Sequence, residues 1–372
     1  VIVWLERSRY IINAEDIFDR GKIMVGINNT WWLIRIALLS LLVAAVTACG
    51  KGADEQESID NAIGYLEKSD LNSASIELKN VLQKNAKNAE ARYLLGKVHL
   101  RLGDVKSAEK ELRRALKAGW DEASVQLALA EAMYRQGDFQ KVLDDIPVKD
   151  SYPDVIKADL LGLWAVSEVG LGKWDEAEGM VSIGESITGD SKWLLQARVR
   201  LEINRNDLHA ADKTLDHALH VYPDSQDLWL FRAGLVEERG DYSGADVALQ
   251  KVIDLDPPRN ITAWGRQARL VQCEIWIRQK DFEKAAEALD PVLKIYPSDP
   301  KANFLGGLIA FMQADYSLAE ERLLNVLTAA PGDYASLMLI GNLKYAQRDY
   351  QQASYYLEKA ASAPVSYTHL RA

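Results

Sequence analysis

A turn pattern recurs nine times along this chain and constrains its fold more than any other feature. Each copy has a turn pair, a large apolar residue, two variable residues and a small residue, as in the stretch GDYSGA at 240–245. The small residues are Ala74, Ala108, Val142, Ala177, Ala211, Ala245, Ala285, Ala319 and Ala353. They lie 34 residues apart, apart from one spacing of 35 and one of 40. A fixed period of this length indicates stacked helix–turn–helix units rather than one globular core.

Further positions keep the same register. The residue twelve places before each small residue is itself small or modest in size: Ala62, Gly96, Ala130, Ala165, Val199, Ala233, Cys273, Gly307 and Gly341. The residue four places after is always apolar: Leu78, Leu112, Ile146, Val181, Leu215, Leu249, Leu289, Leu323 and Leu357. This pattern predicts a first helix that crosses closely over an apolar ridge on the second helix. Glycine suits the turn because it adopts positive φ, and aspartate suits the cap of the second helix.

A helix–turn–helix period of 34 residues resembles the tetratricopeptide repeat. The resemblance implies an all-α solenoid, a right-handed superhelix of about nine repeats over residues 58–361. The register breaks at two places. The second helix of the third unit looks short near 146–153, and six residues are added around 256–260. Insertions in solenoids map to one face, which is often the binding face.

The N-terminal residues fit no repeat. Residues 1–23 do not begin with Met, and we interpret them as non-native upstream sequence before a start at Met24. Residues 31–48 (WWLIRIALLSLLVAAVTA) form an apolar run that is short for a membrane span but typical of a signal peptide. The run ends at Cys49 and resembles a bacterial lipobox, with Val46 where leucine is usual. This predicts a lipoprotein signal peptide at 24–48, a lipidated Cys49 and a polar tether over 49–57.

Two alternatives remain for this segment: a plain secretory signal, or a membrane anchor with an incidental cysteine. At the other end, residues 362–372 start no new repeat and lack the amphipathic helix that caps a solenoid. We interpret them as an irregular tail whose native origin is open, at the end of a fragment.

Composition and motifs argue against other classes of function. A net charge of −10 and a pI near 5.2 argue against a nucleic-acid binder, which would carry a basic stripe. The chain has no glycine-rich phosphate loop, nucleophile elbow or HExxH motif, so we expect no enzyme and no cofactor. His217 and His220 are spaced to share a metal, but solvated helix residues are far more common, and we predict no metal site. Cys273 stands at a helix crossing and reads as a packing residue.

The best candidates for binding are the residues that face the concave groove by repeat register. They are Tyr93, Lys97, Arg101, Tyr134, Arg135, Arg200, Asn204 and Asn342. Arginine binds carboxylates bidentately, so a basic strip with aromatic edges suits an extended acidic segment or a chain-terminal carboxylate. The alternative is a set of ordinary solvated residues, with Glu90 and Glu131 neutralising the strip.

The lipobox followed by the first repeats resembles a narrower family. The stretches IELKNVLQKN (76–85), EARYLLGKVHLRLGD (90–104) and LALAEAMYRQGDFQKVLDDI (127–146) are similar to the PEP-CTERM system TPR-repeat lipoproteins of the PrsT type. That resemblance implies a lipid-anchored, non-enzymatic scaffold that binds protein partners in exosortase-linked sorting or exopolysaccharide export. Gly50 lacks the aspartate that retains lipoproteins in the inner membrane, which favours the outer membrane. The alternative is a periplasmic chaperone-like adaptor for outer-membrane or peptidoglycan assembly.

Overall fold

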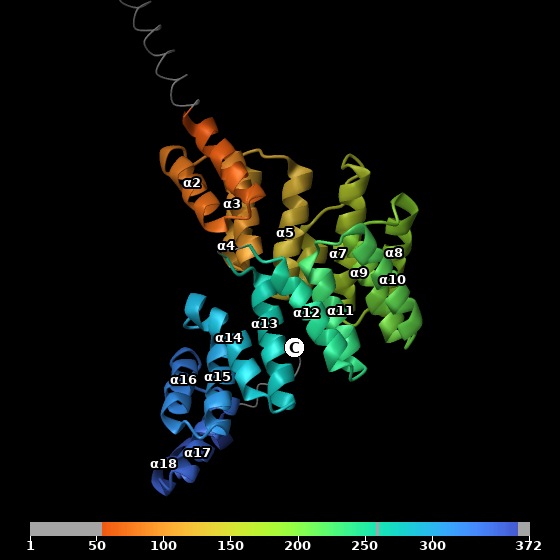
Figure 1. Ribbon diagram of the computed structural model, residues 1–372. Helices are drawn as coiled ribbons and strands as arrows, with labels where there is room; N and C mark the ends of the chain where they lie inside the picture. Colours follow the sequence, from red (N-terminus) through yellow and green to blue (C-terminus); the bar gives the residue numbers. More distant parts are fainter. Residues whose placement is uncertain (1–53, 258–259, 364–372) are drawn as a thin grey trace, which may run out of the picture. The chain divides into compact units, whose positions relative to one another are not determined.

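The computed structural model describes residues 54–257 and 260–363, and the regular structure within these ranges is entirely α-helical (Figure 1). The chain divides into two compact units, Val1–Asp60 and Asn61–Ala372. Only the end of the first unit, residues 54–60, is described, and it lies in a run of helix over 54–67.

The helices that follow are α2 (Leu71–Lys84), α3 (Ala89–Leu102), α4 (Val105–Lys117), α5 (Glu122–Gln136), α6 (Phe139–Asp145), α7 (Asp154–Gly170), α8 (Trp174–Ile187), α9 (Lys192–Asn204), α10 (Leu208–Val221), α11 (Gln226–Glu238), α12 (Tyr242–Asp254), α13 (Ala263–Arg278), α14 (Phe282–Ile295), α15 (Pro300–Met312), α16 (Tyr316–Ala329), α17 (Tyr334–Ala346) and α18 (Tyr350–Ser362). Each helix packs on its neighbour in the sequence, and the first helices of most successive pairs also touch. This arrangement is the all-α solenoid that the period predicts.

The predicted crossing positions lie in the core. All nine small residues that define the period are buried, with exposed fractions of 3% or less. The glycines of the first helices pack directly against the apolar ridge of the second. A Cβ added to Gly96 would lie 2.6 Å from Leu112 Cγ, and one added to Gly307 would lie 2.8 Å from Leu323 Cγ. The small residue of the first helix and the ridge leucine of the second helix therefore form one helix–helix contact.

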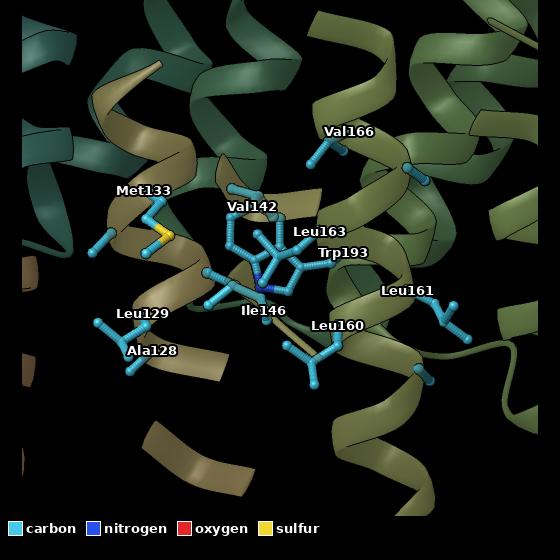
Figure 2. Close-up of a cluster of buried hydrophobic side chains, with 14 of the residues drawn as sticks. Ala128, Leu129, Met133, Val142, Ile146, Leu160, Leu161, Leu163, Val166 and Trp193 are labelled. Carbon is cyan, nitrogen blue, oxygen red and sulfur yellow. The ribbon is translucent and has the colours of Figure 1, made fainter. Parts of the chain in front are cut away.

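The short second helix of the third unit is confirmed. Helix α6 has seven residues, and the chain after it closes the core with Ile146 and Tyr152, both buried. Figure 2 shows the Trp193 ring between α5 and α7, beside Val142 and Ile146.

The interhelix turns share one backbone conformation. The first residue of every turn has positive φ, between 56° and 81°. Four of them are glycine, and the other five are Ser69, Asn206, Lys280, Ala314 and Arg348. In seven turns the next residue caps the second helix, because its aspartate accepts a hydrogen bond from the amide three residues later: Asp70, Asp104, Asp207, Asp241, Asp281, Asp315 and Asp349. The first residue of the turn therefore keeps a positive φ even in the five units where it is not glycine.

Replacing Ala314 with glycine is expected to stabilise the eighth unit. An L-residue at φ 62° costs about 1–2 kcal/mol, while glycine adds chain entropy to the unfolded state, so we expect a net gain of roughly 0.5–1 kcal/mol. Hydrogen exchange in α15 and α16 measures the gain locally. Ala330→Gly is the matched control, because Ala330 has φ −135° and relieves no strain. Equal slowing of exchange in both variants would contradict this interpretation.

Candidate protein-binding groove

A small cavity gathers part of the predicted groove. About 110 Å³ of space is lined by Lys97, Leu100 and Arg101 of α3 and by Glu131 and Arg135 of α5, with residues of α11 and α13 closing it. Arg101 and Arg135 are 34 residues apart, so they occupy the same offset in adjacent repeats. The repeat register therefore places their side chains on the same face, as the sequence predicts.

Arg135 is held firmly at the wall of this cavity. Its Nη1 donates to the Leu100 carbonyl oxygen at 2.9 Å, and its Nη2 lies 2.5 Å from Glu131 Oε1. Its guanidinium carbon lies 4.5 Å from the centre of the Trp264 ring, a cation–π contact. Its Nε is buried without a hydrogen-bond partner among the described residues. Arg135 is thus a fixed, partly satisfied cation rather than the free, solvent-facing side chain that the register alone suggests.

Lys97 and Arg101 carry charges that no carboxylate pairs in the described part of the chain. Lys97 is exposed, with its Nζ 5.7 Å from the centre of the Tyr93 ring. Arg101 Nη2 donates to Ser69 Oγ at 3.1 Å, and burial lowers the pKa of its guanidinium. Tyr93 stacks on Trp120 with ring centres 5.8 Å apart, and burial raises the pKa of its hydroxyl. The result is a positively charged, aromatic-edged wall.

The other predicted groove residues lie apart from this cavity. Tyr134 packs against Phe139 and Trp193, at 5.7 and 5.6 Å between ring centres, so its ring faces the core. Arg200 lies over Phe231, with 4.8 Å from its guanidinium carbon to the ring centre. Asn204 ends α9 and Asn342 lies on α17, and both are exposed. The structure therefore joins Lys97, Arg101 and Arg135 and leaves the other four elsewhere, with Tyr93 beside Lys97.

Sequence reasoning did not place Gln226, Thr262 and Trp264 at the cavity, although all three line it. Thr262 and Trp264 follow the added residues around 256–260, so the break in register was the signal. A partly buried ion pair was missed as well: Lys192 Nζ lies 2.9 Å from Asp227 Oδ2. Burial lowers the pKa of Lys192, but Asp227 and Glu131 raise it by more, so the net shift is upward. Both partners therefore stay charged at neutral pH.

Three further findings concern metals, thiols and membranes. Within residues 54–257 and 260–363 no group of three or more metal-binding side chains is assembled. His217, one of the two histidines spaced to share a metal, has its Nε2 2.8 Å from Asp190 Oδ1. Cys273 is fully buried, and desolvation raises the pKa of its thiol to about 12, as suits a packing residue. No helix among the described residues has the length and hydropathy to cross a membrane. The predicted signal peptide and Cys49 lie outside those residues.

Comparison with known families decides the class of repeat. Family profiles described as "Tetratricopeptide repeat" match residues 65–131, 123–143, 197–260 and 277–334, more than half of the chain in all. The chain belongs to the tetratricopeptide repeat proteins. Such repeats indicate a protein-interaction scaffold, and no enzyme family matches.

Several solved structures are similar to this chain at low sequence identity. MamA from Desulfovibrio magneticus RS-1 is 18% identical over 47% of this tetratricopeptide chain and 96% of its own, with a TM-score of 0.41. PilW, described as a widely conserved type IV pilus biogenesis factor, is 16% identical over 57% and 98%, with a TM-score of 0.48. The human IFIT1 dimer is 15% identical over 84% and 73%, with a TM-score of 0.46. A sequence search of curated proteins finds no match.

Proposed function

We propose that this chain is a non-enzymatic scaffold, anchored by lipid at Cys49 in the bacterial cell envelope and facing the periplasm. Its partners are proteins of exosortase-linked sorting or exopolysaccharide export, and the outer membrane is the favoured location. The lipobox-like run before Cys49, followed at once by tetratricopeptide repeats, supports this combination. Several acyl chains at about 0.8 kcal/mol per buried CH₂ would hold such a scaffold at the membrane.

The observation that carries the binding proposal is the cationic wall of Lys97 and Arg101. Both side chains lie at a cavity without a carboxylate partner in the described ranges, and Tyr93 stands beside them. A carboxylate from an extended partner segment, or from a chain terminus, would find two donors and an aromatic edge there. This binding needs no catalytic residue and no cofactor.

The paired change Lys97→Glu with Arg101→Gln is expected to abolish co-purification of envelope partners, because it replaces both unpaired cations. Arg135 is left intact, since its bonds to Leu100 and Glu131 hold the wall together. Affinity of the unchanged protein should also fall as salt rises. The measurement is quantitative mass spectrometry of proteins recovered from solubilised membranes.

A control with the same net charge change uses Lys106→Glu and Lys110→Gln, two exposed lysines on the outer helix α4. It should keep the partners. Full recovery of the same partners by the groove variant would refute binding at this wall. Recovery of outer-membrane or peptidoglycan assembly proteins, rather than sorting or export proteins, would favour the adaptor function instead.

A further inference from the structure

Asn260 and Ala263, at the end of the break in register and just after it, dock on the first two repeats. Asn260 Oδ1 accepts a hydrogen bond from the Leu71 amide at 3.2 Å, between residues 189 apart in sequence. Ala263 sits so close to the turn before α4 that a Cβ on Gly103 would lie 2.8 Å from its own Cβ. Asn260, Ile261 and Thr262 are buried. We call residues 260–264 the clasp, because they join the seventh unit to the N-terminal groove.

The seventh unit and its neighbours hold the clasp in shape. Thr262 Oγ1 lies 2.7 Å from Asp256 Oδ1 and 2.9 Å from Gln226 Oε1. Tyr296 Oη donates to the Ile261 carbonyl oxygen at 3.0 Å. Thr262 also caps α13, since its hydroxyl accepts from the Gly265 amide at 2.9 Å. The extended stretch before α13 is thus presented in one conformation to the N-terminal repeats.

On the groove side the clasp leaves a cavity open and brings no carboxylate to the cations of Lys97 and Arg101. Its contacts there are the bond from Leu71, the Trp264 ring over Arg135 and the close approach at Gly103. The cavity of about 110 Å³ remains beside Thr262 and Trp264. The clasp thus brings a side-chain carboxamide and an aromatic ring to the groove but no carboxylate to its cations.

We propose that the N-terminal groove is a docking site for a segment with a side-chain carboxamide in an extended stretch and, four residues later, an aromatic ring in the first turn of a helix. The clasp is its resident occupant within the same chain, and a partner segment of the same chemistry displaces it. A partner that also brings a carboxylate to Lys97 and Arg101 gains a contact that the clasp lacks; this last step rests on the proposed function. Access to the groove is therefore controlled by the chain itself.

The test adds the clasp sequence to the protein as a separate peptide. A fluorescein-labelled peptide of residues 255–266 (LDPPRNITAWGR) is titrated against the full chain and followed by anisotropy. The unchanged chain should bind it poorly, because a tethered occupant competes at an effective concentration on the order of millimolar. The variant Asn260→Ala with Trp264→Ala removes the two side chains through which the clasp contacts the groove and leaves the groove side chains of α3 and α5 unchanged. It should bind the peptide about tenfold more tightly or better, and exchange the Leu71 amide faster.

Matched glycine variants show where the peptide sits. Adding Gly103→Ala to the freed variant should abolish peptide binding, because the new Cβ meets Ala263 of the peptide. Adding Gly137→Ala should not, although its φ of 80° imposes the same strain as the 81° of Gly103, because nothing lies within 4 Å of it. If the double variant loses helical content, Asn260→Ala alone serves, since it removes only the bond from Leu71.

Equal peptide binding by the freed and unchanged chains would overturn the proposal, as would binding that Gly103→Ala leaves intact. A wild-type dimer with each clasp seated on the other copy would overturn occupation within one chain. None of these readouts involves an envelope partner. A failed search for partners would therefore count against the proposed function and not against the clasp.

Discussion

Replacing Cys49 with serine is expected to abolish labelling of the protein by a fatty-acid analogue and to release it from the membrane fraction. A hydroxyl cannot replace the thiolate that forms the thioether to lipid. The apolar run before Cys49 is short for a membrane span, so it should not hold the protein by itself. Metabolic labelling followed by membrane fractionation measures both effects.

Cys273→Ala is the control for this experiment. It removes the other cysteine of the chain, which is buried and free, and should leave labelling and membrane partition unchanged. Persistent labelling of the Cys49→Ser protein would refute the lipoprotein assignment. Loss of labelling with full membrane retention would instead favour an uncleaved apolar anchor.

Replacing Gly162 with alanine is expected to cause a large local loss of stability. Gly162 is buried in α7, and an added Cβ would lie 2.5 Å from both the Leu194 amide nitrogen and the Trp193 carbonyl carbon. These are backbone atoms of α9 and cannot rotate away, so α7 and α9 must separate. Overpacking of this kind costs roughly 1–3 kcal/mol or more, against about 1 kcal/mol gained from helix propensity. Hydrogen exchange should accelerate in α7, α8 and α9.

Gly234→Ala provides the matched comparison in another first helix. Gly234 is exposed on α11 with nothing within 4 Å of an added Cβ, so alanine should stabilise that helix by about 0.5–1 kcal/mol. Because each repeat contacts its neighbours, both effects should stay near the substitution. Uniform loss of protection along the whole solenoid after Gly162→Ala would be incompatible with local stacking.

Much of the fold follows from the sequence alone. The period, the small residues such as Ala108 and the ridge residues such as Leu112 specify contacts between residues close in the chain, and the structure buries both. The turn conformation also follows, even at Ala314, because the same backbone geometry recurs in every unit. These features are local or between neighbouring units, where register fixes the geometry.

The groove was only partly predictable. Register placed Arg101 and Arg135 on one face, but it could not show that Arg135 bonds Leu100 and stacks on Trp264. Nor could it show that the ring of Tyr134 packs towards Trp193 instead. The position of a residue within the repeat predicts the direction of its side chain. The groups that this side chain contacts depend on which residues the neighbouring units bring close to it.

The sequence by itself determined the repeat, its turns and its helix crossings, because each is set within about one 34-residue period. It also marked residues 256–260 as an insertion. Only the tertiary structure decided where that insertion docks. The contact from Asn260 to Leu71 spans 189 residues, and it forms because small rotations between successive repeats add up along the solenoid. The accumulated rotation cannot be read from any local sequence pattern. The contact of the clasp with the first repeats is therefore established only by the positions of all the intervening units.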